Sequence, residues 1–386
     1  MSERRLLMIP GSTIQDPSVL RAMCQQSDSH LSLEWAEKFK AVLNDLKKIL
    51  LTSGESFVFA GSGTLSQEAG LGSLIEPGDS VLCLDNGYFG GRFADIARRY
   101  GARTEVLRVE WGQAIKAEEV KRALKGKRFK AVTAAHVETS TGVAMPIREI
   151  GEALRDSGLF FVVDAIASLG GMELRPDDWG LDVVCSCSQK CIGVPPGLVL
   201  IGAGRRAVEF LQQRKSDVPA FYADLKNWLP CMVDPAKYHA TPPINLIYAL
   251  GQACKLILKE GLEARFIRHR KLAEAFREAM KALGLRLVPE PGFEADTVTA
   301  TYYPQGVEDS AFRQEVERNG VIIARGFGPL EGKIFRVGHM GQVTLADLMA
   351  TIGAIERSFK ALQVEIELGS GLVAAQKALM QPSPAK

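Results

Sequence analysis

Two residues that each follow an apolar segment, Asp164 and Lys190, are suited to chemistry on a pyridinium ring. Asp164 ends the run that begins at Phe160, and Lys190 ends the segment Ser186–Lys190, 26 residues after Asp164. A carboxylate can pair with a protonated ring nitrogen, and a lysine amine can form a Schiff base with an aldehyde. The pair therefore predicts an enzyme that uses pyridoxal 5'-phosphate (PLP) as an electron sink.

The surroundings of both residues agree with this prediction. A carboxylate at the end of a buried strand is costly without a positive partner, which a ring nitrogen would supply. Ile166 lies two residues after Asp164, so it projects to the same side and can support the ring. Prolines and glycines follow Lys190, and desolvation there would lower the lysine pKa and favour the neutral amine. The alternatives are an N-cap aspartate and an exposed turn lysine.

A phosphate site is expected where the segment Ala60–Thr64 follows a strand and opens a helix. Gly61 and Gly63 allow close approach of a ligand, the helix N–H groups point at anions, and Ser62 and Thr64 add hydroxyl donors. The segment lacks the third glycine of a dinucleotide fingerprint and the Gly-Lys-Ser/Thr of a P-loop.

Three further segments carry candidate ligand contacts, each with a structural alternative. Phe89 lies between glycines after a strand and can stack on a planar ring, or it is a core aromatic. The polar segment His136–Gly142, with Ser140, can bond a ring phenolate, or it forms a turn. Arg336 has apolar neighbours and can clamp a carboxylate with two parallel bonds, or it belongs to a structural ion pair.

Composition sets the broad class. The chain has 386 residues, 46% of them hydrophobic and 24% charged, with a net charge of +2. We expect a globular enzyme that binds neither nucleic acid nor membrane, because there is no basic excess and no apolar run of about 18 residues. Seven cysteines and no secretory signal predict reduced thiols in the cytoplasm. Cys185, Cys187 and Cys191 suit a core strand better than a metal site, so we expect no metal.

The predicted elements place these residues in an α/β fold. Apolar strands alternate with helices over residues 56–201, and this pattern predicts a mostly parallel sheet covered on both faces. Long helices are expected over 243–260 and 262–283, followed by mixed strands and helices. We divide the chain into an extended arm (1–20), a large PLP-binding domain (21–260), a small C-terminal α/β domain (261–368) and a loose or locally helical tail (369–386).

Taken together, the motifs resemble those of fold-type I, class V PLP-dependent aminotransferases, within them the alanine–glyoxylate and serine–pyruvate group. The resemblance extends over residues 10–362 and rests on the following segments: Pro10–Ser12, Gly61–Thr64, Asn86–Gly90, Glu138–Gly142, Val163–Gly171, Ser188–Lys190, Pro195–Gly197, Tyr238–Pro243 and Arg336–Gly338. It implies a large domain with a mostly parallel seven-stranded sheet and a smaller C-terminal domain.

The resemblance also implies a role for each candidate residue. Lys190 would be the Schiff-base lysine and Asp164 the partner of the pyridine nitrogen. The remaining cofactor contacts would be Ser62, Gly63, Thr64 and Gln189 at the phosphate, Ser140 at the ring hydroxyl, and Phe89 and Ile166 on the two ring faces. Tyr238 and Thr241 would reach the phosphate of the neighbouring subunit in a homodimer. Arg336, with Gly11 and Ser12, would bind the substrate. Family members often have Trp at position 89 and His at position 64, so Phe89 and Thr64 are departures.

The expected reaction is a ping-pong transamination through the Lys190 Schiff base. An amino group would pass from a small amino acid, alanine or serine, to a 2-oxo acid, glyoxylate or pyruvate. Residues Ser12, Thr13, His30 and Asn245 leave open a ureido-bearing donor, as in a ureidoglycine aminotransferase. A cysteine desulfurase or another class V lyase would need a reactive cysteine, for which loop-like Cys231 is the candidate. The third alternative is a non-catalytic subunit that kept the fold.

Overall fold

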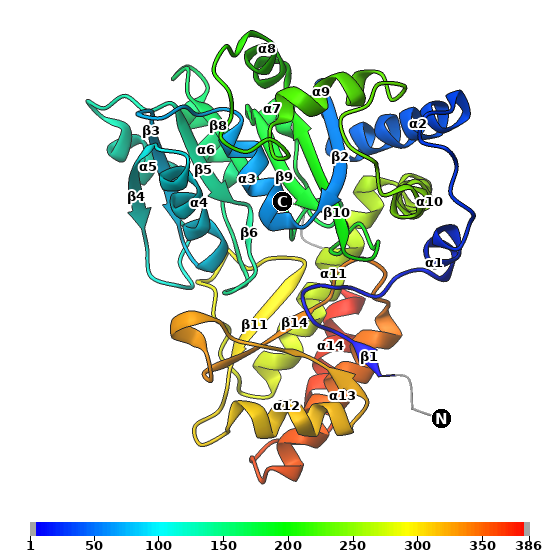
Figure 1. Ribbon diagram of the computed structural model, residues 1–386. Coiled ribbons are helices and arrows are strands. Elements are labelled where there is room, and N and C mark those ends of the chain that lie inside the picture. The colour runs from blue at the N-terminus through cyan, green and yellow to red at the C-terminus, as the bar shows by residue number, and fades with distance from the viewer. Residues whose placement is uncertain (1–4, 382–386) are drawn as a thin grey trace.

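The computed structural model describes residues 5–381, which form a large sheet with helices around it and a smaller sheet beside a second group of helices (Figure 1). The large sheet has seven strands in the order β2-β10-β9-β8-β5-β3-β4. Only β10 runs antiparallel to its neighbours. The expected α/β architecture with a mostly parallel seven-stranded sheet is confirmed. Its strands are β2 (Glu55–Gly61), β3 (Ser80–Asp85), β4 (Arg103–Arg108), β5 (Ala131–Ala135), β8 (Phe160–Asp164), β9 (Val183–Cys187) and β10 (Gly197–Ala203).

Helices cover the large sheet because its strands are apolar on both faces. Every residue of β8 and β9 is buried. Helix α3 packs on β9 and β10, α4 on β3 and β4, and α2 and α9 on β2. The helices of this part are α1 (Pro17–Met23), α2 (Leu33–Leu50), α3 (Gly63–Gly72), α4 (Tyr88–Arg99), α5 (Ala117–Leu124), α6 (Ile147–Leu154), α7 (Pro176–Trp179), α8 (Arg205–Gln213), α9 (Leu225–Val233) and α10 (Ile244–Glu260).

The strand directions explain why the predicted site residues gather at one edge. Strands β5, β8 and β9 are parallel to one another, and β2 runs in the same direction because both β2 and β9 are antiparallel to β10. The carboxyl ends of these four strands therefore lie at the same edge of the sheet. Asp164 ends β8, and Lys190 comes three residues after β9. Segments that are far apart in sequence thereby place their polar ends in one region.

The smaller sheet is antiparallel, with the order β11-β14-β13, and has its own hydrophobic core. Its elements are α11 (Leu262–Ala282), β11 (Val298–Tyr302), α12 (Asp309–Arg318), β12 (Val321–Ile322), β13 (Ala324–Arg325), the short 3₁₀ turn Gly328–Leu330, β14 (Ile334–Gly338), α13 (Leu345–Ala361) and α14 (Ser370–Met380). The apolar run over 321–324, which is typical of a single strand, is divided between two strands, because β12 pairs with the N-terminal β1 (Leu6–Leu7) while β13 pairs with β14. The remaining pair of short strands is β6 (Val137–Glu138) with β7 (Val143–Ala144).

The segment expected to be a loose or locally helical tail contains an ordered helix. Helix α14 packs along α11, and Ala375 is fully buried in the smaller core. The buried carboxylate of Glu356 on α13 accepts hydrogen bonds from Gly369 N–H (2.8 Å) and Gly371 N–H (2.9 Å), which fixes the start of α14. We therefore propose that the C-terminal unit extends through α14. Residues 382–386 of the expected tail lie outside the described range.

The N-terminal arm connects the smaller sheet to the segment that carries Lys190. At one end, Met8 N–H donates to Ile322 O (2.9 Å) and Gly338 N–H donates to Met8 O (2.8 Å). At the other end, Thr13 N–H donates to Gln189 O (3.2 Å) and Thr13 Oγ1 donates to Lys190 O (2.8 Å). The arm was expected to be extended over residues 1–20, but it bends over residues 9–12, and Asp16 caps α1, so residues 17–20 are helical. Residues 1–4 of the arm lie outside the described range.

Within residues 5–381, none of the helices combines the length and apolar composition that a membrane span requires.

Candidate active site

One cavity at the carboxyl edge of the large sheet brings together eight of the predicted site residues. Its lining comes from the start of α3, the first turn of α4, the segment after β5 and the ends of β8 and β9. The lining residues are Ser62, Gly63, Thr64, Phe89, Arg92, Val137, Thr139, Asp164, Ile166, Ala167, Gln189 and Lys190. Residues from five separate segments thus face a common space.

Asp164 is buried at the end of β8 with two hydrogen-bond donors and no cation in contact. Gln67 Nε2 donates to its Oδ2 (2.6 Å), and the N–H of Ile166 donates to its Oδ1 (2.7 Å). Burial, with a smaller contribution from the charge of Glu138, raises the pKa of Asp164 to about 7. A positively charged group in the cavity would stabilise the ionised carboxylate, which is what a protonated ring nitrogen would do.

Lys190 reaches the cavity from the turn after β9. Burial lowers the pKa of its amine, and the charge of Arg336 acts in the same direction. The Nζ donates to the carbonyl oxygen of Pro10 in the arm. Gly11 is adjacent, and a Cβ there would come within 2.5 Å of Lys190 Cδ, so a glycine is needed at this approach. Residues of the arm thus lie directly against the predicted Schiff-base lysine.

The start of α3 offers donors to an anion. Ser62 occupies the N-cap position but its side chain makes no capping hydrogen bond, so the first N–H groups of the helix have no side-chain acceptor. Arg92 Nη1 donates to Thr64 Oγ1 (2.8 Å), and Arg92 forms no ion pair with residues 5–381. Uncapped N–H groups and a free guanidinium fit a phosphate group.

Phe89 and Ile166 provide apolar surface in the same cavity. The Phe89 ring packs edge-on against Tyr88 (5.2 Å between centroids) and has the guanidinium of Arg92 5.0 Å from its centroid. At Gly63, a Cβ would come within 2.6 Å of Ile166 Cδ1, so the glycine lets α3 approach this side chain closely. A planar ring would find apolar contacts here beside the polar groups.

Ser140 lies outside the cavity lining, and its neighbour Thr139 lies within it. The Ser140 hydroxyl donates to Glu138 Oε1 (2.6 Å) and accepts from Tyr88 N–H (3.2 Å), so it is engaged within the protein. The structure therefore favours Thr139 over Ser140 as the residue beside a bound ring. The resemblance implied Ser140, whereas the direction of each of the two adjacent hydroxyls is visible only in the structure.

Arg336 on β14 is buried, and its guanidinium is held by two backbone carbonyls. Nε donates to Arg325 O (2.8 Å) and Nη1 donates to Thr139 O (2.9 Å), while the guanidinium lies 4.4 Å from the centre of the Phe327 ring. Burial lowers the pKa of Arg336 to about 10. Its Nη2 makes no hydrogen bond to the part of the chain that the structure describes, so it remains available for a substrate carboxylate.

Six predicted site residues lie outside this lining: Ser140, Gly11 and Arg336, described above, and Ser12, Tyr238 and Thr241. Tyr238 and Thr241 lie in the segment before α10, where Tyr238 Oη and Thr241 Oγ1 are 3.2 Å apart and the Tyr238 side chain is 59% exposed. Ser12 follows Gly11 in the arm but is not among the lining residues. The single chain therefore does not bring Tyr238 and Thr241 to the Lys190 cavity.

Gln67 and Arg92 were not anticipated from the sequence, and Glu138 and Thr139 appeared only as members of the polar segment His136–Gly142. Gln67 lies one helical turn after Gly63, a spacing that returns a side chain to the same face of α3 and could have indicated it. Arg92 lies one turn after Phe89, with the same consequence on α4. Glu138 and Thr139 carried no such signal, because the path of the β6–β7 turn is not periodic.

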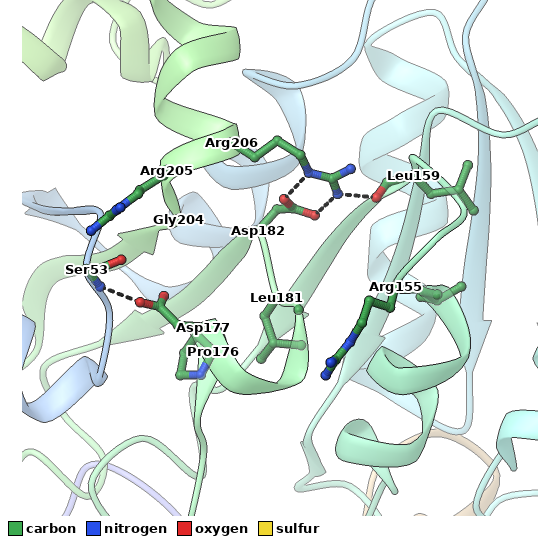
Figure 2. A pocket seen from close by; sticks show the side chains of 12 residues that line it. Ser53, Arg155, Leu159, Pro176, Asp177, Leu181, Asp182, Gly204, Arg205 and Arg206 are labelled. Atoms are coloured by element: carbon green, nitrogen blue, oxygen red, sulfur yellow. Dashed lines mark hydrogen bonds and ion pairs between the residues drawn. The ribbon is translucent and has the colours of Figure 1, made fainter.

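A second hollow lies at the opposite edge of the large sheet, between α8, α7 and the start of β9 (Figure 2). Its acidic groups already have partners within the protein. Both carboxylate oxygens of Asp182 accept from Arg206 (2.7 and 2.5 Å), and Asp177 accepts from Ser53 N–H (2.7 Å). It lacks the buried amine and unpaired carboxylate of the Lys190 cavity, so we assign the chemistry to that cavity.

Comparison with known proteins gives a consistent result. The family model described as aminotransferase class-V matches residues 10–330. An uncharacterized aminotransferase of Methanocaldococcus jannaschii is 37% identical over 98% of each chain. The crystal structure of ureidoglycine–glyoxylate aminotransferase from Bacillus subtilis superposes with a TM-score of 0.95 at 32% identity, over 99% of both chains. That of an alanine–glyoxylate aminotransferase from Nostoc sp. gives 0.89 at 35% identity, over 93% of this chain and 96% of that one.

Proposed function

The chain belongs to the class V aminotransferases, whose cofactor is pyridoxal 5'-phosphate, and we propose that it moves an amino group from alanine or serine to glyoxylate or pyruvate. One observation carries this proposal. Lys190, with an amine pKa lowered by burial, and Asp164, with a carboxyl pKa raised by burial, line the same cavity. Groups with such opposite shifts mark a site prepared for acid–base chemistry.

The residues present fit the cofactor. The uncapped start of α3 and Arg92 would hold its phosphate, Asp164 its ring nitrogen, and Phe89 and Ile166 its ring. When bound, PLP supplies an aldehyde and a ring that accepts electrons. We assign Thr139, rather than Ser140, to the position beside the ring hydroxyl, because only Thr139 faces the cavity.

Lys190 and Arg336 have separate roles toward the substrate: proton transfer and binding of the α-carboxylate. The neutral Lys190 amine removes the proton from the amino acid α-carbon and later returns a proton, acting in turn as base and acid. Arg336 orients the α-carboxylate through its free Nη2, while its bonds to Thr139 O and Arg325 O keep the guanidinium in place. A fixed carboxylate restricts which bond of the α-carbon faces Lys190.

Two features support a small donor and glyoxylate. Both structural relatives named above are glyoxylate aminotransferases, one paired with alanine and the other with ureidoglycine. Asn245 was a candidate for a ureido group, but its Nδ2 donates to Met23 O and Gln25 O, both at 2.7 Å, and its Oδ1 accepts from Ser27. With its amide fully engaged and outside the cavity lining, Asn245 is not free to bind a ureido group, which removes one reason to expect ureidoglycine as the donor.

We propose a homodimer in which Tyr238 and Thr241 complete the phosphate site of the neighbouring subunit. Both side chains are turned to the surface near His30, whose ring lies 5.6 Å from that of Tyr238. Mixing Lys190→Ala subunits with Tyr238→Ala subunits tests this. Shared sites predict that the mixture regains activity that neither parent has, whereas an unchanged mixture would contradict it.

Two alternatives lose support from the structure. Cys231, the candidate desulfurase nucleophile, is buried in α9, and burial raises the pKa of its thiol. A thiol that stays protonated is a poor nucleophile. A non-catalytic subunit would not need the Lys190–Asp164 cavity.

All seven cysteines are free thiols, which supports the proposed cytoplasmic location.

The test is a set of half-reactions followed by absorbance. Protein with PLP should show a band near the visible edge that alanine or serine converts and glyoxylate or pyruvate restores. Lys190→Ala should lack turnover while keeping the fold. No band with intact Lys190 would overturn the proposal, and conversion by ureidoglycine or aspartate alone would reassign the donor.

A further inference from the structure

The buried carboxylate of Glu138 holds four hydrogen bonds beside the cavity, yet the reaction described above gives it no role. Its Oε2 accepts from the N–H groups of Phe89 and Gly90, both at 2.9 Å. Its Oε1 accepts from Ser140 N–H (3.1 Å) and Ser140 Oγ (2.6 Å). All four partners act as donors, so every acceptor position of the carboxylate is used. Burial raises the pKa of Glu138, and these four hydrogen bonds act in the opposite direction.

These contacts make Glu138 a helix cap supplied from a distant part of the chain. Helix α4 begins at Tyr88, so Phe89 and Gly90 are its second and third residues, whose N–H groups an N-cap side chain normally binds. The N-cap residue here is Gly87, which has no side chain to do so. Glu138, on β6, fills that position, and a negative charge is favourable at a helix N-terminus.

The glycine at position 87 is required for this arrangement. A Cβ on Gly87 would come within 2.4 Å of Glu138 Cγ and 2.7 Å of Ser140 Oγ. The backbone of Gly87 is extended, with φ of 164°, so other residues can adopt it and only space excludes them. A side chain at 87 and the carboxylate of Glu138 are therefore mutually exclusive ways to cap α4.

We propose that Glu138 is a positioning residue that caps α4 from outside and thereby sets the place of Phe89 in the cofactor cavity. Phe89 lies in the first turn that Glu138 caps. On the other side, Thr139 follows Glu138 directly, lines the cavity and binds Arg336 through its carbonyl. Glu138 thus connects Phe89 to the turn in which the carbonyl of Thr139 holds Arg336. The inference rests on the proposed PLP site.

The test removes the Glu138 carboxylate and then supplies another cap for α4 from position 87. Glu138→Ala should weaken PLP binding, measured from the absorbance of titrated protein below its unfolding temperature, by about tenfold or more, since buried donors are left without partners. In Glu138→Ala the Ser140 hydroxyl loses its acceptor and can rotate away from position 87, where it would otherwise lie 2.7 Å from a new Cβ. Glu138→Ala combined with Gly87→Ser therefore has room for an N-cap hydroxyl and should recover most of the affinity. Recovery would support capping, because the serine restores neither the charge nor the position of the carboxylate.

Gly204→Ser is the matched control. Gly204 is likewise an N-cap glycine without a side-chain cap, on α8 at the opposite edge of the sheet, and a Cβ there meets nothing closer than 3.4 Å. It should leave PLP affinity unchanged. Glu138→Gln keeps an acceptor oxygen and serves if the alanine variant does not fold; it should weaken binding by a smaller factor.

The outcomes separate this inference from the proposed function. Wild-type affinity in folded Glu138→Ala, or a lowered unfolding temperature with unchanged PLP affinity, would overturn the positioning role. So would a double variant that binds no better than Glu138→Ala. Failure of the wild-type protein to bind PLP would instead remove the proposed function itself.

Discussion

The side-chain amide of Gln67 donates to the carboxylate of Asp164 at 2.6 Å, and its nitrogen also lies 3.3 Å from the carbonyl oxygen of Phe89. This one side chain connects the predicted partner of the ring nitrogen to the predicted stacking residue. Gln67 lies on α3, one turn after the start of that helix, where the phosphate is predicted to bind, so a single helix connects three parts of the predicted site.

Replacing Gln67 should therefore weaken the cofactor site without touching its charged groups. Gln67→Leu keeps the volume but leaves Asp164 without one donor, which should raise the dissociation constant of PLP about tenfold. Gln67→Glu should have a larger effect, because a second carboxyl group next to Asp164 opposes its ionisation. Gln252→Leu on α10, where the amide donates to Ser18 Oγ (3.1 Å), is the matched control. Equal affinities for all three variants would contradict this prediction.

Asp164 should make the PLP-free protein less stable as the pH rises. Its pKa is about 7 in the folded protein against the usual 3.8, so between these values the folded state binds more protons than the unfolded state. Stability from this group is then present at low pH and lost as the pH rises through about 7, in total about 4 kcal/mol. Urea unfolding at several pH values should show this loss relative to Asp164→Asn. Parallel curves for the two proteins would show that Asp164 ionises normally.

Gly11→Ala should disturb Lys190 directly. The added Cβ would lie 2.5 Å from Lys190 Cδ and 2.6 Å from Nζ, at a backbone φ of 108°. We expect kcat to fall at least about tenfold, since a displaced amine no longer faces the substrate α-carbon. Gly292→Ala is the control: its φ is 91°, but nothing lies within 4 Å of the new Cβ. A similar loss in both variants would point to backbone strain instead of contact with Lys190.

Arg336→Lys should separate substrate binding from cofactor binding. Lysine keeps a positive charge but cannot hold Thr139 O and Arg325 O while presenting a further N–H to a carboxylate. KM for the amino acid should rise about 10- to 100-fold. The PLP affinity should stay near that of the wild type. A loss of PLP with unchanged KM would place Arg336 at the cofactor and not at the substrate.

The fold was largely predictable, because the sheet strands are apolar and the helices between them are periodic. The exceptions have physical causes. The apolar run over 321–324 is divided between two strands because the arm pairs with its first half, and no local pattern encodes a partner more than 300 residues away. Helix α14 was missed as a packed element because its contacts with α11 bury only part of one face.

Where chemistry demands a residue type, as for Asp164 and Lys190, the sequence singled out residues that the structure places in one cavity. A site residue was harder to predict where only the direction of its side chain decides whether it faces the cavity. Thr139 and Ser140 are adjacent hydroxyls with equal chemistry, and only the turn after β6 determines which one faces the cavity. Glu138 was quoted as part of a motif but not assigned, because its partners Phe89 and Gly90 are nearly 50 residues away.

The hydrogen bonds at both ends of the N-terminal arm matter for preparing this protein. Residues 8–13 are hydrogen-bonded at one end to β12 and β14 and at the other end to the Lys190 turn. One backbone segment thus joins the two parts of the molecule beside the predicted Schiff-base amine. Proteolytic cleavage within residues 8–13 would separate its two ends. Preparations cleaved there should therefore have a lower specific activity than the intact protein.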